Sequence, residues 1–541
     1  MPSPISEISG HIIDIHHKRI FTGTVRISEG RITTIAEHMD VPDQFILPGF
    51  VDAHIHIESS MVTPYEFSRV ACGHGTIATV SDPHEIANVC GMEGVKYMIE
   101  SAREAAIKIF FGAPSCVPAT GFETAGAVIG PEDVDKLLAS EDIWYLSEMM
   151  NYPGVLHEDN EVLAKISSAK KYNKPVDGHA PGLRGEDARK YISHGITTDH
   201  ECFTLQEALD KLRYGMKIII REGSAAKNFE ALHPLIAEYP EFVMFCSDDK
   251  HPDDLMEGHI NDLVKRALIL GYDLFDVLRI ACLNPLLHYG LPVGQLREGD
   301  RADFIVIEDT RDWKVKMTVV DGVPVYSNGK CHLEAKKAEH INRFNARELQ
   351  ASSLKVKATG QPHDIIRAVD GSLITEKLRY MLPEAEGYSL PDPALDILKI
   401  CVINRYSVAK PAVGFISHFG LRGCAIASTV AHDSHNIIAV GDEDELIARA
   451  VNLLMESRGG LSFVSGAGET HLPLPVAGLM SDHSVREAGE LYAKMTMLAK
   501  ENGSKLHAPY MTLSFMALLV IPKIKISDLG MFDAEAWQFY Q

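Results

Sequence analysis

The sequence is poor in cysteine and has no excess of basic residues. Its nine cysteines are odd in number, widely scattered and contain no C-x-x-C pair, a usage that is typical of reduced thiols in a cytoplasm. Lysine and arginine total 52 against 74 aspartates and glutamates, for a formal net charge of -22. Such a charge opposes binding to nucleic acid or to an anionic membrane surface, and we expect a small-molecule substrate instead.

Long apolar runs are also missing. No stretch approaches the length of a membrane span, and the N-terminal residues lack the charged start and apolar centre of a signal peptide. We therefore expect a cytoplasmic protein without a membrane partner. At 541 residues the chain exceeds the size of one hydrophobic core, so it should contain two or more domains.

Short β-branched runs separated by turns flank a long central region. They occupy residues 12–36, where Glu29-Gly30 predicts a hairpin turn, and they return after the central region. We expect the two stretches to form one small β-sandwich. A charged linker from about Lys336 leads into a C-terminal domain of α/β or α+β type. The predicted limits are 1–48 and 289–335 for the sandwich, 49–288 for the central region and 336–541 for the last domain.

The central region alternates short apolar strands with longer amphipathic stretches. Eight strands end in polar or charged residues, namely VDAHIHIESS, TIATVSDPHE, IKIFFGAPS, DIWYLSEMMN, KPVDGHAPG, GITTDHEC, MKIIIREGS and FVMFCSDD. Eight such β/α units predict an α/β fold of the (β/α)8 TIM-like barrel type, in which the chemistry lies at the C-terminal ends of the strands.

Histidines and carboxylates gather at these strand ends. His54 and His56 end the first strand, where alternation points residues i and i+2 to the same side. Two imidazoles can therefore meet one metal ion, although an isolated H-x-H also fits two surface histidines. Later strand ends add Glu148, His179, His200 and Asp248. Ligands of this kind, spread over several strands, leave room for water on the metal and favour hydrolysis.

At these residues the chain resembles the amidohydrolase superfamily. ILPGFVDAHIH before the barrel and LREGDRADFIVIED after it carry the resemblance, which covers residues 1 to about 335. It implies two divalent metal ions, manganese, iron or zinc. Many members place a carboxylated lysine after the fourth strand, whereas this chain has YLSEMMNYPG, so that Glu148 would bridge the metals. The implied ligands are His54, His56, Glu148, His179, His200 and Asp248.

Within the superfamily the chain is most similar to the bacterial adenine deaminases. The similarity rests on VDAHIHIESSM, VSDPHEIANV, DGHAPG, IIIREGSAAKN, CSDD and VAHDSHNI, the last of which lies in the C-terminal domain. It implies hydrolytic deamination of adenine to hypoxanthine and ammonia by a metal-activated hydroxide, with Asp248 and Glu148 as catalytic residues. It also implies a homo-oligomer, with a dimer as the first expectation.

Two roles stay open at this point. Related purine and cytosine deaminases often use H-x-x-E after the fifth strand to protonate a ring nitrogen, but His179 opens HAPG. Glu201 is a candidate for this acid, and a structural role is the equal alternative because adjacent strand residues point to opposite faces. Asp82, His84 and Glu85 either bind an auxiliary metal or orient the other ligands through hydrogen bonds.

Substrate contacts are expected from both halves of the chain. Arg221, Ser224 and Asp249 follow barrel strands, and Arg221 and Asp249 either touch the purine or pair with each other. In the last domain Asp433 and His435 lie in a turn-prone cluster, either as solvated loop residues or in a loop that closes over the barrel mouth. Five other histidines are interpreted as solvated or structurally satisfied: His16, His17, His251, His259 and His288.

Two alternatives compete with deamination of adenine. A cyclic amidohydrolase of the hydantoinase or dihydroorotase kind would predict lysine where Glu148 stands and does not account for VAHDSHNI. A non-catalytic scaffold that retains a metal would tolerate loss of the ligands, and none of the six positions has become apolar.

Overall fold

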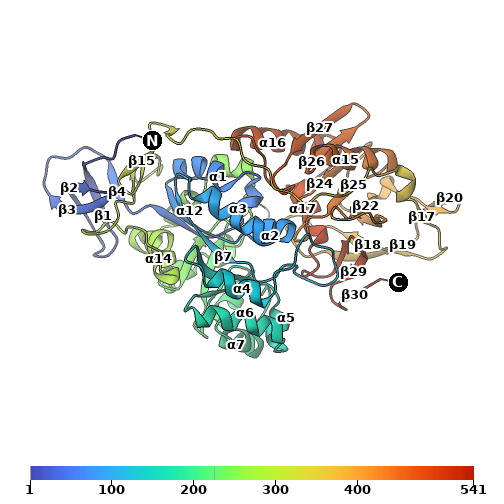
Figure 1. Cartoon of the computed structure of the whole chain (residues 1–541), viewed down its shortest axis with the longest axis horizontal. Helices are drawn as coiled ribbons and strands as arrows, with labels where there is room; N and C mark the ends of the chain where they lie inside the picture. Colours follow the sequence, from blue (N-terminus) through green and yellow to red (C-terminus); the bar gives the residue numbers. More distant parts are fainter. Residues whose placement is uncertain (1, 225, 541) are drawn as a thin grey trace.

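The structure, a computed structural model, describes residues 2–224 and 226–540. Figure 1 shows a central barrel that lies between a β-sheet body, coloured blue at the N-terminus, and the orange and red C-terminal residues. The barrel positions most of the candidate site, and the C-terminal residues cover it.

The eight strands expected for the barrel are present in the expected order. All neighbouring pairs are parallel, with β5 to β9 in one sheet and β10 to β12 in another. The strands are β5 (Phe50–Ile55), β6 (Thr76–Ser81), β7 (Lys108–Ala113), β8 (Ile143–Met149), β9 (Val176–Gly178), β10 (Thr198–Asp199), β11 (Lys217–Arg221) and β12 (Val243–Cys246).

Isolated bridges join the two sheets. Val176 of β9 pairs with Ile196 just before β10, and Ile55 of β5 pairs with Asp248 just after β12, both in parallel fashion. Strands β11 and β12 are almost entirely buried and apolar, as expected where side chains pack on both faces of a parallel sheet. The two bridges complete the ring of strands, and Asp248, which forms one of them, belongs to the candidate site.

Amphipathic helices surround the strands. Helix α6 begins where the Asp159 side chain accepts hydrogen bonds from two backbone N–H groups, and it buries Val162, Lys165, Ile166 and Ala169 at helical spacing. The helices named in this region are α1 (Pro64–Ala71), α2 (His84–Cys90), α3 (Met92–Ala102), α4 (Pro131–Leu138), α6 (Asn160–Lys171), α7 (Gly185–Ser193), α8 (Leu205–Leu212), α11 (Pro252–Glu257), α12 (Ile260–Ile269) and α14 (Asn284–Tyr289).

The two stretches that flank the barrel share one eight-stranded sheet. Its order is β16-β15-β14-β13-β4-β1-β2-β3, and the two parts meet where β4 pairs with β13. Glu29 and Gly30 both have positive φ, as the predicted tight hairpin turn requires. The strands are β1 (Glu7–Asp14), β2 (Arg19–Ser28), β3 (Arg31–Glu37), β4 (Phe45–Leu47), β13 (Phe304–Ile307), β14 (Val315–Val320), β15 (Val323–Ser327) and β16 (Lys330–Cys331).

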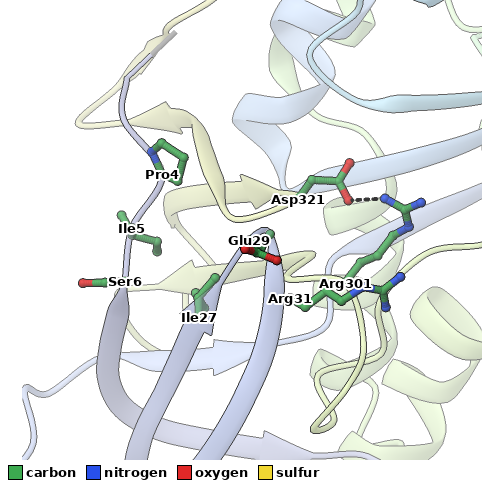
Figure 2. A pocket seen from close by; sticks show the side chains of 9 residues that line it. Pro4, Ile5, Ser6, Ile27, Glu29, Arg31, Arg301 and Asp321 are labelled. Carbon is green, nitrogen blue, oxygen red and sulfur yellow. Dashed lines mark hydrogen bonds and ion pairs between the residues drawn. The ribbon is translucent and has the colours of Figure 1, made fainter.

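A surface hollow in this sheet carries two arginines (Figure 2). Arg301 donates a hydrogen bond to Asp321 at 2.9 Å, and Asp321 also pairs with Lys108 of the barrel at 3.0 Å. Arg31 donates to the carbonyl of Gly299 at 2.9 Å. Since both guanidinium groups already have partners within the fold, the hollow links the sheet to the barrel and offers no arrangement for chemistry.

The C-terminal residues form a second eight-stranded sheet with helices. Its neighbouring pairs are antiparallel except β18 with β23, which agrees with the α+β alternative. The strands are β18 (His363–Arg367), β19 (Glu376–Tyr380), β22 (Ile397–Ile403), β23 (Ala412–Ser417), β24 (Cys424–Ser428), β25 (Ile437–Gly441), β26 (Gly460–Ser465) and β27 (Gly468–Pro473). The helices are α15 (Asp444–Ser457), α16 (Val485–Glu501) and α17 (Pro509–Ser514).

The barrel and the C-terminal residues pack as one body. Buried side chains from both, such as Val62 and Met480, belong to a single apolar cluster. Helix α16 lies so close to α11 that a side chain at Gly489 would meet the sulfur of Met256 at 2.9 Å. Within the described residues, none of the helices has the length and hydropathy needed to cross a membrane.

Candidate active site

The barrel places two histidines from one strand against a carboxylate from the last strand. The Nε2 atoms of His54 and His56 are 3.2 Å apart, and both face Oδ1 of Asp248, at 3.6 and 3.4 Å. All three side chains are buried. The predicted orientation of His54 and His56 toward a common point is therefore present.

The separations between these atoms fit a cation better than direct hydrogen bonds. Distances of 3.4 to 3.6 Å are long for a hydrogen bond between an imidazole nitrogen and a carboxylate oxygen. Two ligand atoms about 2.1 Å from one ion at a tetrahedral angle lie about 3.4 Å from each other. The nitrogen and oxygen donors at the barrel mouth thus have both the chemistry and the spacing of a divalent metal site.

Glu148, at the end of β8, contacts histidines from three other strand ends. Its Oε2 lies 2.7 Å from Nδ1 of His179 and 3.1 Å from Nε2 of His200, while Oε1 lies 3.4 Å from Nε2 of His56. Burial alone would raise the pKa of Glu148, but His179 and the other histidines hold it well below its usual value. An ionised carboxylate that faces two sides of the cluster is suited to join two cations.

Arg221, the last residue of β11, pairs with two carboxylates. Its guanidinium contacts both oxygens of Glu201, with Nη2 2.9 Å from Oε2, and its Nη1 lies 2.6 Å from Oδ2 of Asp248. Although burial would raise the pKa of Asp248, Arg221 and the histidines hold it well below its usual value. Asp248 is therefore a carboxylate at neutral pH, and Glu201 is occupied as the ion-pair partner of Arg221.

The geometry bears on two alternatives that the sequence left open. Glu201 lines the same cavity as His200 instead of pointing away from it, because strand β10 ends at Asp199 and strand alternation no longer applies. Arg221 does not pair with Asp249, whose Oδ1 accepts a hydrogen bond from Ser59 Oγ at 2.5 Å.

The segment of Asp82, His84 and Glu85 divides between two neighbourhoods. His84 Nδ1 lies 3.0 Å from Asp82 Oδ2 and 3.6 Å from Glu148 Oε1, next to the histidine cluster. Glu85 turns instead toward the C-terminal residues: Oε1 lies 2.6 Å from Nδ1 of His432, and Oε2 contacts Nε2 of His435. The three residues therefore form a chain of contacts, since His84 Nε2 also lies 3.5 Å from Glu85 Oε1, and Glu85 extends this chain to the C-terminal residues by direct hydrogen bonds.

C-terminal residues complete a cavity over the strand ends. Helix α2 begins at His84, and the next residue, Glu85, contacts His432 and His435 of the C-terminal half. The cavity is lined by histidines, carboxylates and other side chains of the barrel. Five residues from the C-terminal half also line it, namely Leu373, His432, Asp433, Phe515 and Leu518. These five are all buried, so the barrel mouth is covered.

Asp433 and His435 are placed differently within this cover. Both are buried, so the interpretation of solvated loop residues is wrong. Asp433 lines the cavity, whereas His435 does not line it and instead contacts Glu85. Burial and the carboxylate of Glu85 raise the pKa of Asp433 to about 6.

Other predicted residues lie outside the cavity. Ser224 is not among the lining residues, and its hydroxyl donates to Asp254 at 2.5 Å and accepts from the backbone of His251 at 2.9 Å. His259 is a satisfied core histidine, since it contacts Asp52 at 2.8 Å and Thr76 at 2.6 Å. These contacts assign both side chains to local structure.

The sequence analysis missed His432 and the apolar cover. His432 stands inside VAHDSHNI and could have been read from that motif. Phe515, whose ring stacks on His432 with centroids 4.8 Å apart, and Leu373 lie in ordinary apolar runs. No local pattern marks such residues, because their role depends on packing between distant segments.

Two family models match the chain. The Amidohydrolase family model matches residues 45–325, and the Adenine deaminase C-terminal domain model matches residues 372–538. The chain is 52% identical over 541 residues to a protein named adenine deaminase from Salinibacter ruber, which covers 100% of this chain and 99% of that protein. Proteins of the same name from Sulfurovum sp. and Methanosarcina barkeri are 53% and 50% identical, and each alignment covers 98% of this chain and at least 98% of the relative.

Proposed function

This chain belongs to the adenine deaminases of the amidohydrolase family, and from that premise we propose that the covered cavity hydrolyses the C6–N bond of adenine. Water adds to C6 and the amino group leaves, so that adenine and water give hypoxanthine and ammonia. The observation that carries the proposal is the set of buried histidines and carboxylates at the barrel mouth, in a chain that aligns with adenine deaminases over its whole length.

The family uses divalent metals, and the donor set fits them. We propose two ions per subunit, manganese, iron or zinc, held by His54, His56, Glu148, His179, His200 and Asp248. Such ions supply positive charge that lowers the pKa of a coordinated water toward neutrality. Two proposals remain for Asp82, His84 and Glu85. They either bind an auxiliary metal or orient the other ligands through hydrogen bonds.

The protein side chains transfer protons and hold one another in position. Asp248 is an ionised carboxylate beside His54 and His56, where it can accept the proton of the attacking water and return it to the departing amine. Arg221 fixes Asp248 through the 2.6 Å ion pair and keeps it charged. The apolar cover formed by residues such as Phe515 and Leu518 excludes bulk water from the reacting atoms.

The cyclic amidohydrolase alternative depends on a lysine at the metals. Lys165 is the buried lysine nearest in sequence to Glu148, and its Nζ donates to the carbonyl of Ser115 at 2.9 Å and pairs with Glu161 at 3.1 Å. This lysine is engaged elsewhere, which supports Glu148 as the bridge. The scaffold alternative finds no support in a site where five of the six donors line one cavity and the sixth, His54, lies beside His56 and Asp248.

A direct assay tests the function. The metal-loaded enzyme is mixed with adenine, and hypoxanthine and ammonia are measured together with the loss of adenine absorbance. We expect one ammonia per hypoxanthine, and no release of ammonia from hydantoin or dihydroorotate. Ring opening of a cyclic amide without turnover of adenine would instead favour the alternative.

Glu148→Gln tests the bridge. Glutamine keeps the shape but loses the charge that holds two cations close together, so metal analysis should show lower occupancy than in the wild type. Lys165→Met serves as the matched control, because it removes a buried charge that we place outside the metal site. Unchanged binding of two metals by Glu148→Gln, with loss in Lys165→Met, would contradict the assignment.

The domain limits, the oligomeric state and the cellular location are also proposals. We propose the domain limits 1–48, 49–288, 289–335 and 336–541, with the flanking sheet folded as a sandwich. A homodimer and a cytoplasmic location are proposed as well, the latter in keeping with nine cysteines that are all free. Light scattering on the purified protein decides the oligomeric state.

A further inference from the structure

One carboxylate of the cavity has no partner for a buried oxygen. Asp433 lines the cavity and is 3% exposed, yet its Oδ2 has no hydrogen-bond partner among residues 2–224 and 226–540. A buried charged oxygen without a donor is costly. The unused acceptor therefore points to a donor that arrives with the substrate.

The other carboxylates of the cavity are already engaged. Glu148 faces histidines, Glu201 and Asp248 pair with Arg221, and Asp249 accepts from Ser59. Glu85 is held by His432 and His435. Within the described chain, Asp433 is the cavity-lining carboxylate left with a buried unsatisfied oxygen.

The loop that carries Asp433 is tied down on both sides. Asn436 accepts a hydrogen bond from the backbone of Arg405 at 3.0 Å and donates to the carbonyl of Thr124 at 2.9 Å. Tyr406 donates to the carbonyl of Ser434 at 2.5 Å. Since the neighbours of Asp433 are fixed, the carboxylate is presented to the cavity in a preorganised position.

The shape of adenine matches this position. Its reacting carbon, C6, must approach the histidines and carboxylates at the strand ends, which form the floor of the cavity. The N9 corner of the five-membered ring is on the far side of the bicyclic base from C6. With C6 at that floor, we place N9 toward the part of the cavity lining that belongs to the C-terminal half, which includes Asp433.

We propose that Asp433 accepts a hydrogen bond from the N9–H group of adenine and is the residue that selects the free base. The inference rests on the proposed function and extends it to specificity. Adenosine carries its sugar on N9 and has no hydrogen to donate there, and the residues of the cover that line the cavity are buried. A site built around a substrate N–H rejects analogues that lack it by roughly a thousandfold or more.

Two isosteric analogues make the test specific. The adenine analogue 7-deazaadenine keeps N9–H, whereas 9-deazaadenine has a carbon at that position and adds no bulk. Dissociation constants of both analogues and of adenine's product, hypoxanthine, are measured by calorimetry on the metal-loaded wild type, Asp433→Ala, Asp433→Asn and Asp364→Asn. The last is the matched control, because Asp364 lies on β18 and does not line the cavity.

Asp433→Ala should weaken binding of 7-deazaadenine about 10- to 100-fold, the range for a hydrogen bond to a charged group, and change that of 9-deazaadenine by less than about threefold. Asp433→Asn, which keeps an uncharged acceptor, should fall between wild type and alanine. Equal losses for both analogues, a larger loss for 9-deazaadenine, or no loss would each overturn the proposal.

Metal content and kcat are measured on the same samples. Failure of the wild type to release ammonia from adenine would count against the proposed function, whereas the binding pattern of the analogues tests the role of Asp433 by itself. Asp433→Asn keeps the test valid if the alanine variant does not fold, because asparagine has nearly the same shape.

Discussion

Single residues in the cavity differ mainly in whether their charge already has a partner. Asp248 has Arg221 on one side and two histidines on the other, so it is charged and fixed at once. Asp433 has a buried oxygen that nothing in the described chain satisfies. This difference is the reason why we propose Asp248 for proton transfer and Asp433 for recognition.

Asp248→Asn should reduce kcat by at least about a thousandfold while the protein stays folded. Asp248 has φ of 52 degrees, a left-handed conformation that asparagine tolerates well, so the backbone should not be disturbed. Steady-state kinetics with adenine, circular dichroism and metal analysis check the expectation. A near-normal kcat would mean that the base is another residue.

His74 gives a pH dependence of stability away from the site. Burial and the charge of His259 lower the pKa of His74 to about 4, and its Nε2 contacts the carbonyl of Leu255 at 2.8 Å. Because the unfolded chain binds a proton near pH 6.5 and the folded chain resists it, stability is lost as pH falls from about 6.5 toward 4. The folded state should lose about 1 to 2 kcal/mol from this residue between pH 7 and 5.

His74→Gln keeps a donor for the Leu255 carbonyl but cannot take up a proton. Urea unfolding at pH 7 and pH 5 should therefore show a smaller pH effect in the variant than in the wild type. Some pH effect should remain in the variant, because burial also lowers the pKa of His288, which is a second acid-sensitive group. An identical pH effect in the two proteins would show that His74 is already protonated at pH 5.

At the scale of elements, the segment after β6 is tied to the segment before β25. Glu85, at the start of α2, contacts His432 and His435 at once, and burial lowers the pKa of His432 while Glu85 raises it to about 9. The contact is therefore a hydrogen-bonded ion pair that holds residues 430–436 over the barrel mouth.

Glu85→Gln should loosen this cover. Amide hydrogen exchange of residues 430–436 should become faster and kcat/KM for adenine should fall by about tenfold or more, because the cover excludes water and presents Asp433. Glu93→Gln, an exposed glutamate of α3, is the control and should change neither. Unaltered exchange in Glu85→Gln would show that the cover is held by its apolar contacts alone.

Sequence patterns were most successful in predicting the secondary-structure elements. The apolar runs and their polar ends predicted all eight barrel strands, since strands of a parallel barrel are buried on both faces and differ sharply from the helices between them. Strand alternation could not choose between the two open alternatives for Glu201, because the strand before it is too short for that rule. Strand β10 has two residues, so alternation could not tell that His200 and Glu201 face the same cavity.

For the whole molecule, the sequence could predict which histidines and carboxylates gather at the strand ends but little of the cover. His54 and Glu148 lie near the ends of their strands and Asp248 lies just after one, and the order of the strands fixes their place. The contact between Glu85 and His435 joins residues 350 positions apart, and no local periodicity encodes such a distance. VAHDSHNI drew attention to the right loop, yet the resemblance alone could not separate Asp433, which lines the cavity, from His435, which does not.

Metal removal tests how far the whole molecule depends on the site. Five strand ends contribute to the donor set, which without cations brings buried carboxylates and histidines together at the centre of the barrel. A chelator should abolish turnover of adenine, and added Mn(II), Fe(II) or Zn(II) should restore it.

Because cations bind the folded chain far better than the unfolded one, loading the protein with metal should also raise its thermal midpoint of unfolding. Arg301→Lys in the flanking sheet, outside the donor set, should respond to chelation as the wild type does. Full turnover by protein shown to contain no metal would refute the mechanism, and an unchanged thermal midpoint would show that the barrel closes without help from its ligands.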